Sequence, residues 1–210
     1  MALSTRQRRP TWEMLDVLPY QGEWTVEEYL KLATNKPIEY TNGFLEFLPV
    51  PDEIHWQIQE FLFALVREFL TRRGRGVAHY APFKVRIGTE KFREPDICVL
   101  LDDSDPRRAR KYWGGADAVF EVVSPDDPAR DYIEKRVDYA IAGVLEYWIV
   151  DPSRGQVLVL RLNAGQYTED GPHGSGSSVA SDILPGFSMN VDECFAVLGR
   201  VSPRDIPPAQ

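Results

Sequence analysis

The order of apolar and polar residues changes near Pro51, where a strand-like pattern gives way to a helical one. Before this point, two strand-like runs flank Asn42-Gly43, a pair suited to the positive φ angles of a tight hairpin turn. After it, and until Gly74 and Gly76, apolar side chains recur at helical spacing: Ile54, Ile58, Phe61, Leu62, Leu65, Val66, Phe69 and Leu70. The pattern predicts a β-hairpin over residues 38–48, followed by a long helix.

The middle of the chain predicts strands joined by polar loops, over residues 83–87, 96–100 and 119–123. A helix is then predicted over residues 129–142, ending at Gly143, with an apolar side formed by Ile133, Val137, Ala140 and Ile141. Another strand is predicted over residues 146–150. Strand, helix and strand in this order favour a crossover connection with parallel pairing.

The last third of the chain predicts a strand over residues 156–162, which a short turn joins to the preceding strand as a hairpin. The polar, glycine-rich residues 171–178 predict a flexible loop, and residues 191–198 a short terminal helix. The predicted architecture is α/β, with a mixed central sheet flanked by helices.

Length and composition are typical of one folded domain, because 210 residues with 43% hydrophobic content can bury a sizeable core. We expect this domain to span residues 21–200. Residues 1–20 and the proline-rich residues 201–210 are expected to be a disordered arm and tail.

The net charge of −8 counts against a broad basic surface for nucleic acids. Basic residues cluster locally in two places, at Arg67, Arg72, Arg73 and Arg75, and at Arg107, Arg108, Arg110 and Lys111. Each cluster is consistent with a phosphate contact, and equally with an ordinary solvated face.

The cellular setting is indicated by what the sequence lacks. Cys98 and Cys194 lie far apart in apolar segments, without the close pairs of a zinc site or the density of a disulfide scaffold. The first ten residues have no apolar core typical of a secretory signal, and no apolar run reaches transmembrane length. We expect a cytoplasmic protein with reduced cysteines and no membrane partner.

Two carboxylates, Asp96 and Glu121, lie at ends of short apolar strands. Glu121 shares its strand face with Val119 and Val123, where a carboxylate is costly unless it is paired or bound to a metal. If the strands are neighbours, the two acids can hold one divalent cation such as Mg²⁺, with water and phosphate oxygens as further ligands. The alternatives are that Glu121 reaches water or an arginine, and that Asp96 is a turn residue after Pro95.

These residues resemble the PD-(D/E)xK nuclease superfamily, in which Pro95-Asp96 and Glu121 correspond to the motif acids. A more specific resemblance, to the Uma-type family of restriction-endonuclease-like proteins, is carried by residues 120–125, Lys135, Tyr139 and residues 143–152. The resemblance implies a restriction endonuclease-like fold and metal-dependent cleavage of DNA. It implies that Asp96 and Glu121 are the ligands of Mg²⁺, for which Mn²⁺ can substitute.

One position departs from the superfamily pattern, because Val123 stands where a lysine is expected two residues after the glutamate. The resemblance implies that a helix lysine, here Lys135, supplies this charge instead. Such a cation would orient the attacking water, help lower its pKa, or offset charge on the phosphate. The helical spacing places Lys135 opposite the apolar side, so a surface lysine paired to Asp131 explains it equally well.

His55 and Glu39 complete the candidate site. His55 lies in the first turn of the long helix and points inward, either towards the metal site or as a satisfied, partly buried histidine. Glu39, and less clearly Glu46, occupies the hairpin where the family often has an acid that completes the site through water. Both acids are also consistent with ordinary exposed strand residues.

The leading hypothesis is a magnesium-dependent endodeoxyribonuclease, for which a homodimer would suit double-strand cleavage. A catalytically inactive nuclease-fold module for binding or regulation is the first alternative. The second alternative is a hydrolase that acts on a smaller phosphate ester.

Overall fold

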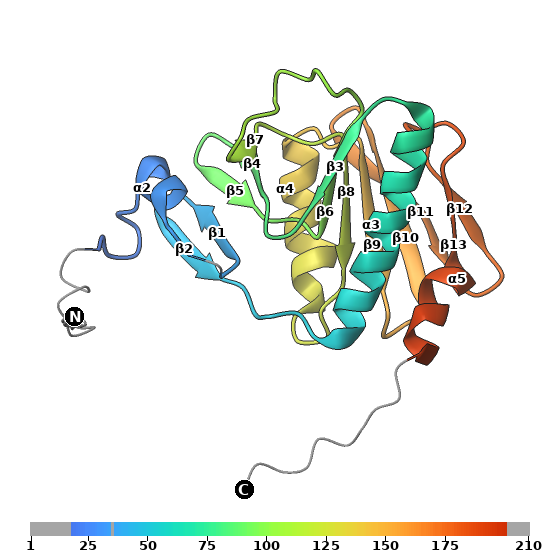
Figure 1. The fold of residues 1–210 in the computed structure, drawn as a ribbon. Coiled ribbons are helices and arrows are strands. Elements are labelled where there is room, and N and C mark those ends of the chain that lie inside the picture. Colours follow the sequence, from blue (N-terminus) through green and yellow to red (C-terminus); the bar gives the residue numbers. More distant parts are fainter. Residues whose placement is uncertain (1–17, 35, 201–210) are drawn as a thin grey trace, which may run out of the picture.

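The computed structural model describes residues 18–34 and 36–200 (Figure 1). Most of the expected arm over residues 1–20 and the whole expected tail over residues 201–210 lie outside the described residues. Within the described residues, two main sheets and a short β-hairpin are flanked by helices, which confirms the predicted mixed α/β class. No helix in this part of the chain is long and apolar enough to cross a membrane.

The larger sheet has the strand order β11-β10-β9-β8-β6-β3. Its strands are β3 (Val77–Tyr80), β6 (Ile97–Leu100), β8 (Ala118–Val122), β9 (Glu146–Asp151), β10 (Gln156–Asn163) and β11 (Gln166–His173). Strands β8 and β9 run parallel, and the other neighbours run antiparallel. The predicted crossover and the predicted hairpin of β9 with β10 are therefore confirmed.

Helices cover both faces of this sheet (Figure 1). The long helix α3 (Glu53–Arg73) buries its predicted apolar side, including Ile58 and Leu62, against Phe120 and its neighbours. On the other face lies a π-helical turn (Arg130–Glu134) that continues into α4 (Lys135–Ile141). Because side chains alternate along a strand, each core strand contributes to both faces.

The smaller sheet has the strand order β2-β1-β5-β4-β7. Its strands are β1 (Ile38–Thr41), β2 (Phe44–Phe47), β4 (Lys84–Gly88), β5 (Lys91–Arg93) and β7 (Tyr112–Trp113). The short helix α2 (Val26–Lys31) packs on it, with Tyr29 against Tyr40 and Phe92. The predicted hairpin over residues 38–48 is confirmed as β1–β2, whereas the strand predicted over residues 83–87 belongs to this sheet and does not pair with β6.

The C-terminal part consists of the hairpin β12 (Ser178–Ala180) and β13 (Ser188–Asn190), then α5 (Val191–Ala196) and a 3₁₀ turn (Val197–Arg200). The predicted terminal helix is confirmed. The loop predicted over residues 171–178 is wrong in its first part, because β11 continues to His173. Strand β10 supplies partner backbone groups there, with Val157 opposite His173, and this pairing overrides the loop-like composition.

The β1–β2 turn has one position that requires glycine. Gly43 has φ +86°, and a Cβ built there would lie 2.5 Å from the backbone oxygen of Gly22. Gly165, in the β10–β11 turn, has the similar φ of +82° but no atom within 4 Å of such a Cβ. A side chain at either position would be strained by the positive φ angle. Only at Gly43 would it also clash with a neighbouring backbone atom.

We expect Gly165→Ala to lower the free energy of unfolding by about 1–2 kcal/mol, the cost of the left-handed conformation alone. Gly43→Ala should lower it by about a further 1–3 kcal/mol, because the Gly22 backbone must move. Urea unfolding of both variants measures the difference. Equal losses would show that the Gly22 contact adds nothing.

Candidate active site

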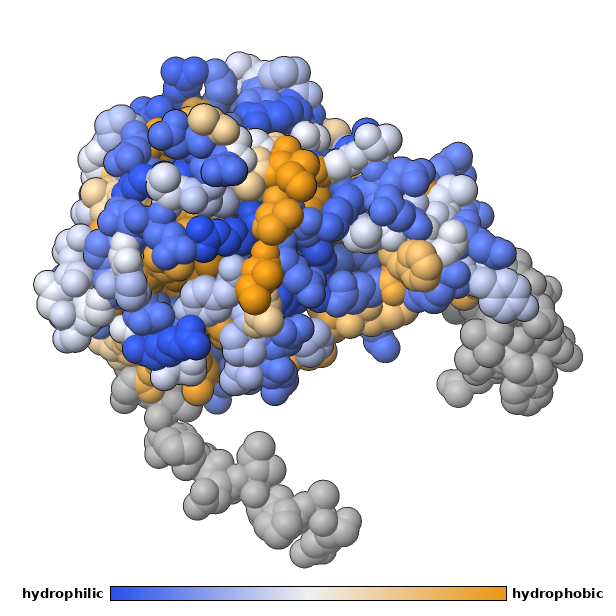
Figure 2. All heavy atoms as spheres, turned by 180° about the vertical axis from the view of Figure 1, so that it is seen from behind, coloured by the Kyte–Doolittle hydropathy of each residue, from blue (hydrophilic) through white to orange (hydrophobic). Residues whose placement is uncertain are grey.

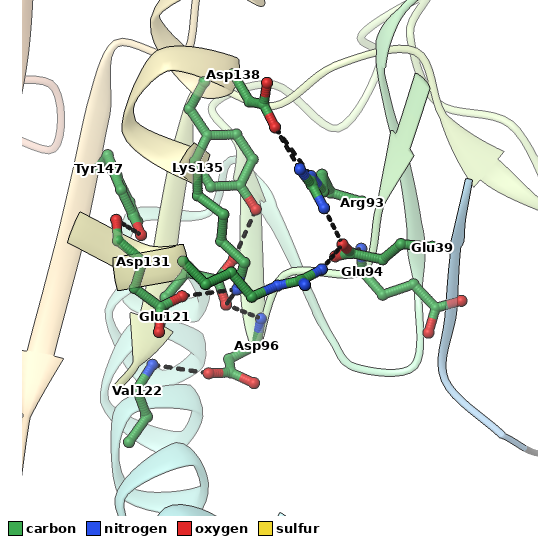
Figure 3. Close-up of polar contacts among 12 residues, drawn as sticks. Glu39, Arg93, Glu94, Asp96, Glu121, Val122, Asp131, Lys135, Asp138 and Tyr147 are labelled. Carbon is green, nitrogen blue, oxygen red and sulfur yellow. Dashed lines mark hydrogen bonds and ion pairs between the residues drawn. The ribbon is translucent and has the colours of Figure 1, made fainter. Parts of the chain in front are cut away.

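Asp96 and Glu121 lie side by side where β6 begins and β8 ends (Figure 3). The strands pair antiparallel with Ile97 opposite Phe120, so the next pair, Asp96 and Glu121, shares one face of the sheet. Asp96 N donates a hydrogen bond to Glu121 Oε2 at 3.2 Å, and Val122 N donates one to Asp96 Oδ2 at 2.7 Å. Both acids are buried, so the alternative in which Glu121 reaches water at a strand end is wrong.

Lys135 reaches the acid pair from the first residue of α4. Its Nζ lies 3.0 Å from Glu121 Oε2 and 2.8 Å from Asp131 Oδ1. The side chain is buried, so the surface-lysine alternative is wrong, although the expected pairing to Asp131 is present. Tyr139, one turn further on, donates a hydrogen bond to Glu121 Oε1 at 2.6 Å. Val123 is buried in the apolar core, and a lysine from the helix lies beside the glutamate instead.

The helix is therefore turned the opposite way from its predicted orientation. Ile133, Val137 and Ile141 are 54–79% exposed, and Figure 2 shows an apolar stripe on this side of the molecule. The side that faces the sheet consists of Asp131, Lys135 and Tyr139. The reason is electrostatic, because each of these polar groups finds a buried partner. The π-helical turn immediately precedes Lys135, and such turns are frequent at functional sites.

His55 and Gln59 hold Asp96 from the first turns of α3. His55 Nε2 lies 2.9 Å from Asp96 Oδ1, and Gln59 Nε2 donates a hydrogen bond to the Asp96 carbonyl oxygen at 2.9 Å. The helix is fixed at this end by Asp52, whose side chain accepts a hydrogen bond from the His55 backbone N–H. The inward direction predicted for His55 is confirmed.

Glu39 is buried behind the site, so its reading as an exposed strand residue is wrong. Its carboxylate forms ion pairs with Arg93 and Arg130 and accepts a hydrogen bond from Glu94 N at 3.0 Å. It does not line the cavity that contains the acid pair. Glu46 is half-exposed, lines that cavity, and pairs with Arg130.

The two arginines of this network were missed by sequence reasoning. Arg93 also pairs with Asp138 at 2.6 Å, and so links β5 to α4. Arg130 adjoins Asp131, on the same charged side of the helix as Lys135 and Asp138. The charged side of this helix could have indicated that the two arginines belong to the site. It was not used, because the apolar side of the helix was expected to face inward.

Burial and neighbouring charges shift the proton affinities of the site. Burial, with the charges of Asp96 and Asp131, raises the pKa of Glu121 to about 7, although Lys135 and the Tyr139 hydrogen bond oppose this. Burial would lower the pKa of Lys135, but the nearby carboxylates of Glu121 and Asp131 outweigh it and raise that pKa. Burial would lower the pKa of His55, but its hydrogen bond to Asp96 and the charges of Asp96 and Glu121 together outweigh burial and raise it. Both shifts favour the cationic form over the neutral one, and the lysine is therefore charged at neutral pH.

A cavity of about 600 Å³ opens over these residues and is lined by Asp96, Glu121, Lys135 and His55, among others. Within the described residues, no group of three or more His, Cys, Asp or Glu side chains could hold a metal ion by itself. The protein thus offers two carboxylates towards a cation, and water or substrate oxygens would have to complete the coordination. This donor set is typical of Mg²⁺ sites that act on phosphates.

The fold matches a crystal structure described as a "putative nuclease belonging to DUF820" from Anabaena variabilis ATCC 29413. The TM-score is 0.67 at 20% sequence identity, and the match covers 83% of this chain and 99% of that chain. The two chains therefore share one α/β fold. Residues 26–192 match the Uma2 family model, described as "Putative restriction endonuclease", and the chain belongs to this family. No curated protein matches the chain.

The buried charge network predicts a specific pH dependence of stability. Burial alone would raise the pKa of Glu39, but Arg93, Lys135 and Arg130 lower it below its ordinary value. The unfolded chain therefore binds a proton at Glu39 before the folded protein does as the pH falls. The stabilisation is complete above about pH 4.3, the ordinary pKa of glutamate, and is lost as the pH falls through the lower folded pKa.

We expect Glu39→Gln to lower the free energy of unfolding by about 3 kcal/mol at pH 7, because Arg93 and Arg130 lose a buried anion. The difference in the free energy of unfolding between the variant and the native protein should become smaller below about pH 4.3. Glu46→Gln is the control, and should cost less than about 1 kcal/mol because Glu46 is half-exposed. Urea titrations at pH 7 and pH 3.5 provide the comparison. A difference in the free energy of unfolding that does not change with pH would contradict the stabilising role of the Glu39 charge.

Proposed function

We propose that this protein is a magnesium-dependent endonuclease that hydrolyses DNA phosphodiester bonds. The observation that carries the proposal is the convergence of Asp96, Glu121 and Lys135 in the lining of one cavity. Membership of a family described as restriction endonucleases supports DNA as the substrate. Hydrolysis of a phosphodiester needs an activated water and positive charge near the phosphate, and this site has residues suited to both tasks.

The residues present fit a divalent cation. Asp96 and Glu121 offer hard carboxylate oxygens on two paired strands, which hold them in fixed positions. Three acids, with Asp131, face one buried lysine, so the site carries an excess of negative charge. Burial, together with the charges of Asp96 and Asp131, raises the pKa of Glu121 to about 7. Bound there, Mg²⁺ would supply charge to stabilise the transition state and lower the pKa of the attacking water.

The surrounding side chains have separate roles in the proposed reaction. The Lys135 ammonium orients the water and offsets charge on the phosphate. His55 and Gln59 fix the direction of Asp96, and Tyr139 fixes that of Glu121. Glu39 contributes without lining the cavity. It holds Arg93 and Arg130 in place through ion pairs, and its negative charge helps to raise the pKa of Lys135.

Two rival functions remain distinguishable from this one. An inactive nuclease-fold module is consistent with the acidic net charge and with Val123 at the usual lysine position, but Lys135 supplies a cation beside Glu121 from the helix. A hydrolase of small phosphate esters would turn over a model phosphodiester and leave DNA intact. A cytoplasmic location and a homodimer stay predictions.

Asp96→Asn and Glu121→Gln should each abolish Mg²⁺-dependent DNA cleavage, with a loss of at least about 100-fold in rate, because each removes a proposed ligand charge. Calorimetry should show that Mn²⁺ binding is lost in the same variants. Circular dichroism reports whether the fold is intact.

Asp127→Asn is the matched control, since Asp127 lines the same cavity but is exposed, and it should retain native cleavage and Mn²⁺ binding. Full cleavage by a folded double variant of Asp96 and Glu121 would falsify the assignment. Absence of Mn²⁺ binding by the native protein, with or without DNA, would favour the inactive module.

Lys135→Ala should lower the turnover number by about 100-fold or more, with little change in KM, because the ammonium acts on the water and the transition state. Lys84→Ala is the comparison, since Lys84 forms a 2.8 Å ion pair with Glu94 and does not line the cavity. It should keep turnover within about threefold of native. Steady-state kinetics on a labelled DNA substrate separate the two parameters. A Lys135→Ala effect confined to KM would assign Lys135 to binding.

A further inference from the structure

The cavity over the acid pair has an apolar wall that the proposed chemistry does not use. Its lining includes Leu48, Val50, Ile54 and Trp56, at the start of α3 and in the segment before it. Trp56 is 46% exposed, and its indole is the only Phe, Tyr or Trp ring that lines this cavity within the described part of the chain. It directly follows His55, which contacts Asp96. A large, half-exposed aromatic side chain thus lines the same cavity as the acid pair.

The charges around the cavity are unfavourable for the phosphate contacts by which proteins usually bind duplex DNA. Eight of the lining side chains are acidic, and two, Arg130 and Lys135, are permanently basic, besides His55, which is paired to Asp96. Both basic groups already form ion pairs, Arg130 with Glu39 and Glu46, and Lys135 with Glu121 and Asp131. Proteins that bind a duplex neutralise several phosphates with lysine and arginine. Few such contacts are available at this site.

The arginine clusters seen in the sequence do not supply that grip, because both lie away from the site. Arg72 and Arg75 are at the far end of α3, whose 21 residues extend about 30 Å, and they pair with Glu68 and Asp102. Arg107 pairs with Asp117, whose carboxylate accepts a hydrogen bond from Leu101 N at the end of β6 opposite Asp96. Neither cluster borders the cavity that contains the acid pair.

We propose that the natural substrate of this site is single-stranded DNA, with the base next to the scissile phosphate stacked on Trp56. The proposal rests on the nuclease function proposed above. An unpaired base exposes its π-face, whereas the bases of a duplex are stacked on one another inside it. Stacking on an aromatic side chain adds affinity beyond the phosphate contacts, so that fewer of them are needed, and it tolerates any base. A cavity of about 600 Å³ also suits one or two nucleotides better than the broad surface that a duplex covers.

The binding test measures fluorescence anisotropy of a labelled ten-residue oligothymidine, with Ca²⁺ in place of Mg²⁺ to prevent cleavage. Trp56→Leu keeps an apolar side chain but removes the π-face, and should weaken binding by about 10- to 100-fold. Trp56→Phe keeps a ring and should change the Kd by less than about threefold. Tyr20→Leu, at an exposed aromatic outside the cavity, should leave the Kd unchanged. Raising the salt from 50 to 200 mM should weaken binding by less than about tenfold, as expected for one or two phosphate contacts.

The cleavage test compares single-stranded and duplex DNA of one sequence in Mg²⁺. Native protein should cut the single strand at least about tenfold faster, and Trp56→Leu should raise KM for it with little change in turnover number. Equal binding and cutting of both forms, or a native Kd in Trp56→Leu, overturns the inference and leaves the nuclease function standing. Oligothymidine binding that depends on Trp56, with no cleavage of any DNA, overturns the nuclease function and, with it, the assignment of single-stranded DNA as a substrate. If Trp56-dependent binding and DNA cleavage are both absent, the inference and the nuclease function are both overturned.

Discussion

The ammonium group of Lys135 is buried between Glu121 on β8 and Asp131 on its own helix, and neither acid would be stable there without it. An unpaired charge in such a place costs several kcal/mol, so the three side chains stabilise one another as a set. The set forms only if the charged side of α4 lies against the sheet. The orientation of the helix, the exposure of its apolar stripe and the crowding of acids at the cavity all follow from this constraint.

A second layer of charges connects the two sheets through the same helix. Glu39 on β1 and Arg93 on β5 belong to the smaller sheet, while Arg130 and Asp138 belong to the helical segment that covers the larger one. The cavity is lined from both sides of this junction, by Glu46 of β2 and by Glu121 of β8. The shape of the site therefore depends on how the sheets dock, and the ion pairs fix that docking in one geometry.

Local sequence patterns were sufficient to predict the elements whose structure is determined by neighbouring residues in the chain. The Asn42-Gly43 pair predicted the hairpin, with φ angles of +47° and +86°, and helical periodicity predicted α3. The position of Asp96 beside Glu121 required β6 and β8 to be neighbours, which the sequence left open and the structure shows. Strand β5, with two charges in three residues, carries no pattern, so the division into two sheets was not predictable. Nor was the orientation of α4, since the partners of its charged side come from distant strands.

The inverted helix has a consequence for protein engineering. Hydropathy-guided redesign would keep Ile133, Val137 and Ile141 as core and freely replace the charged residues of α4. In this protein those three positions contact solvent and are the ones open to solubilising changes, whereas Lys135 and Asp131 are the interior. Variant libraries drawn from the sequence alone would thus randomise the wrong half of the helix.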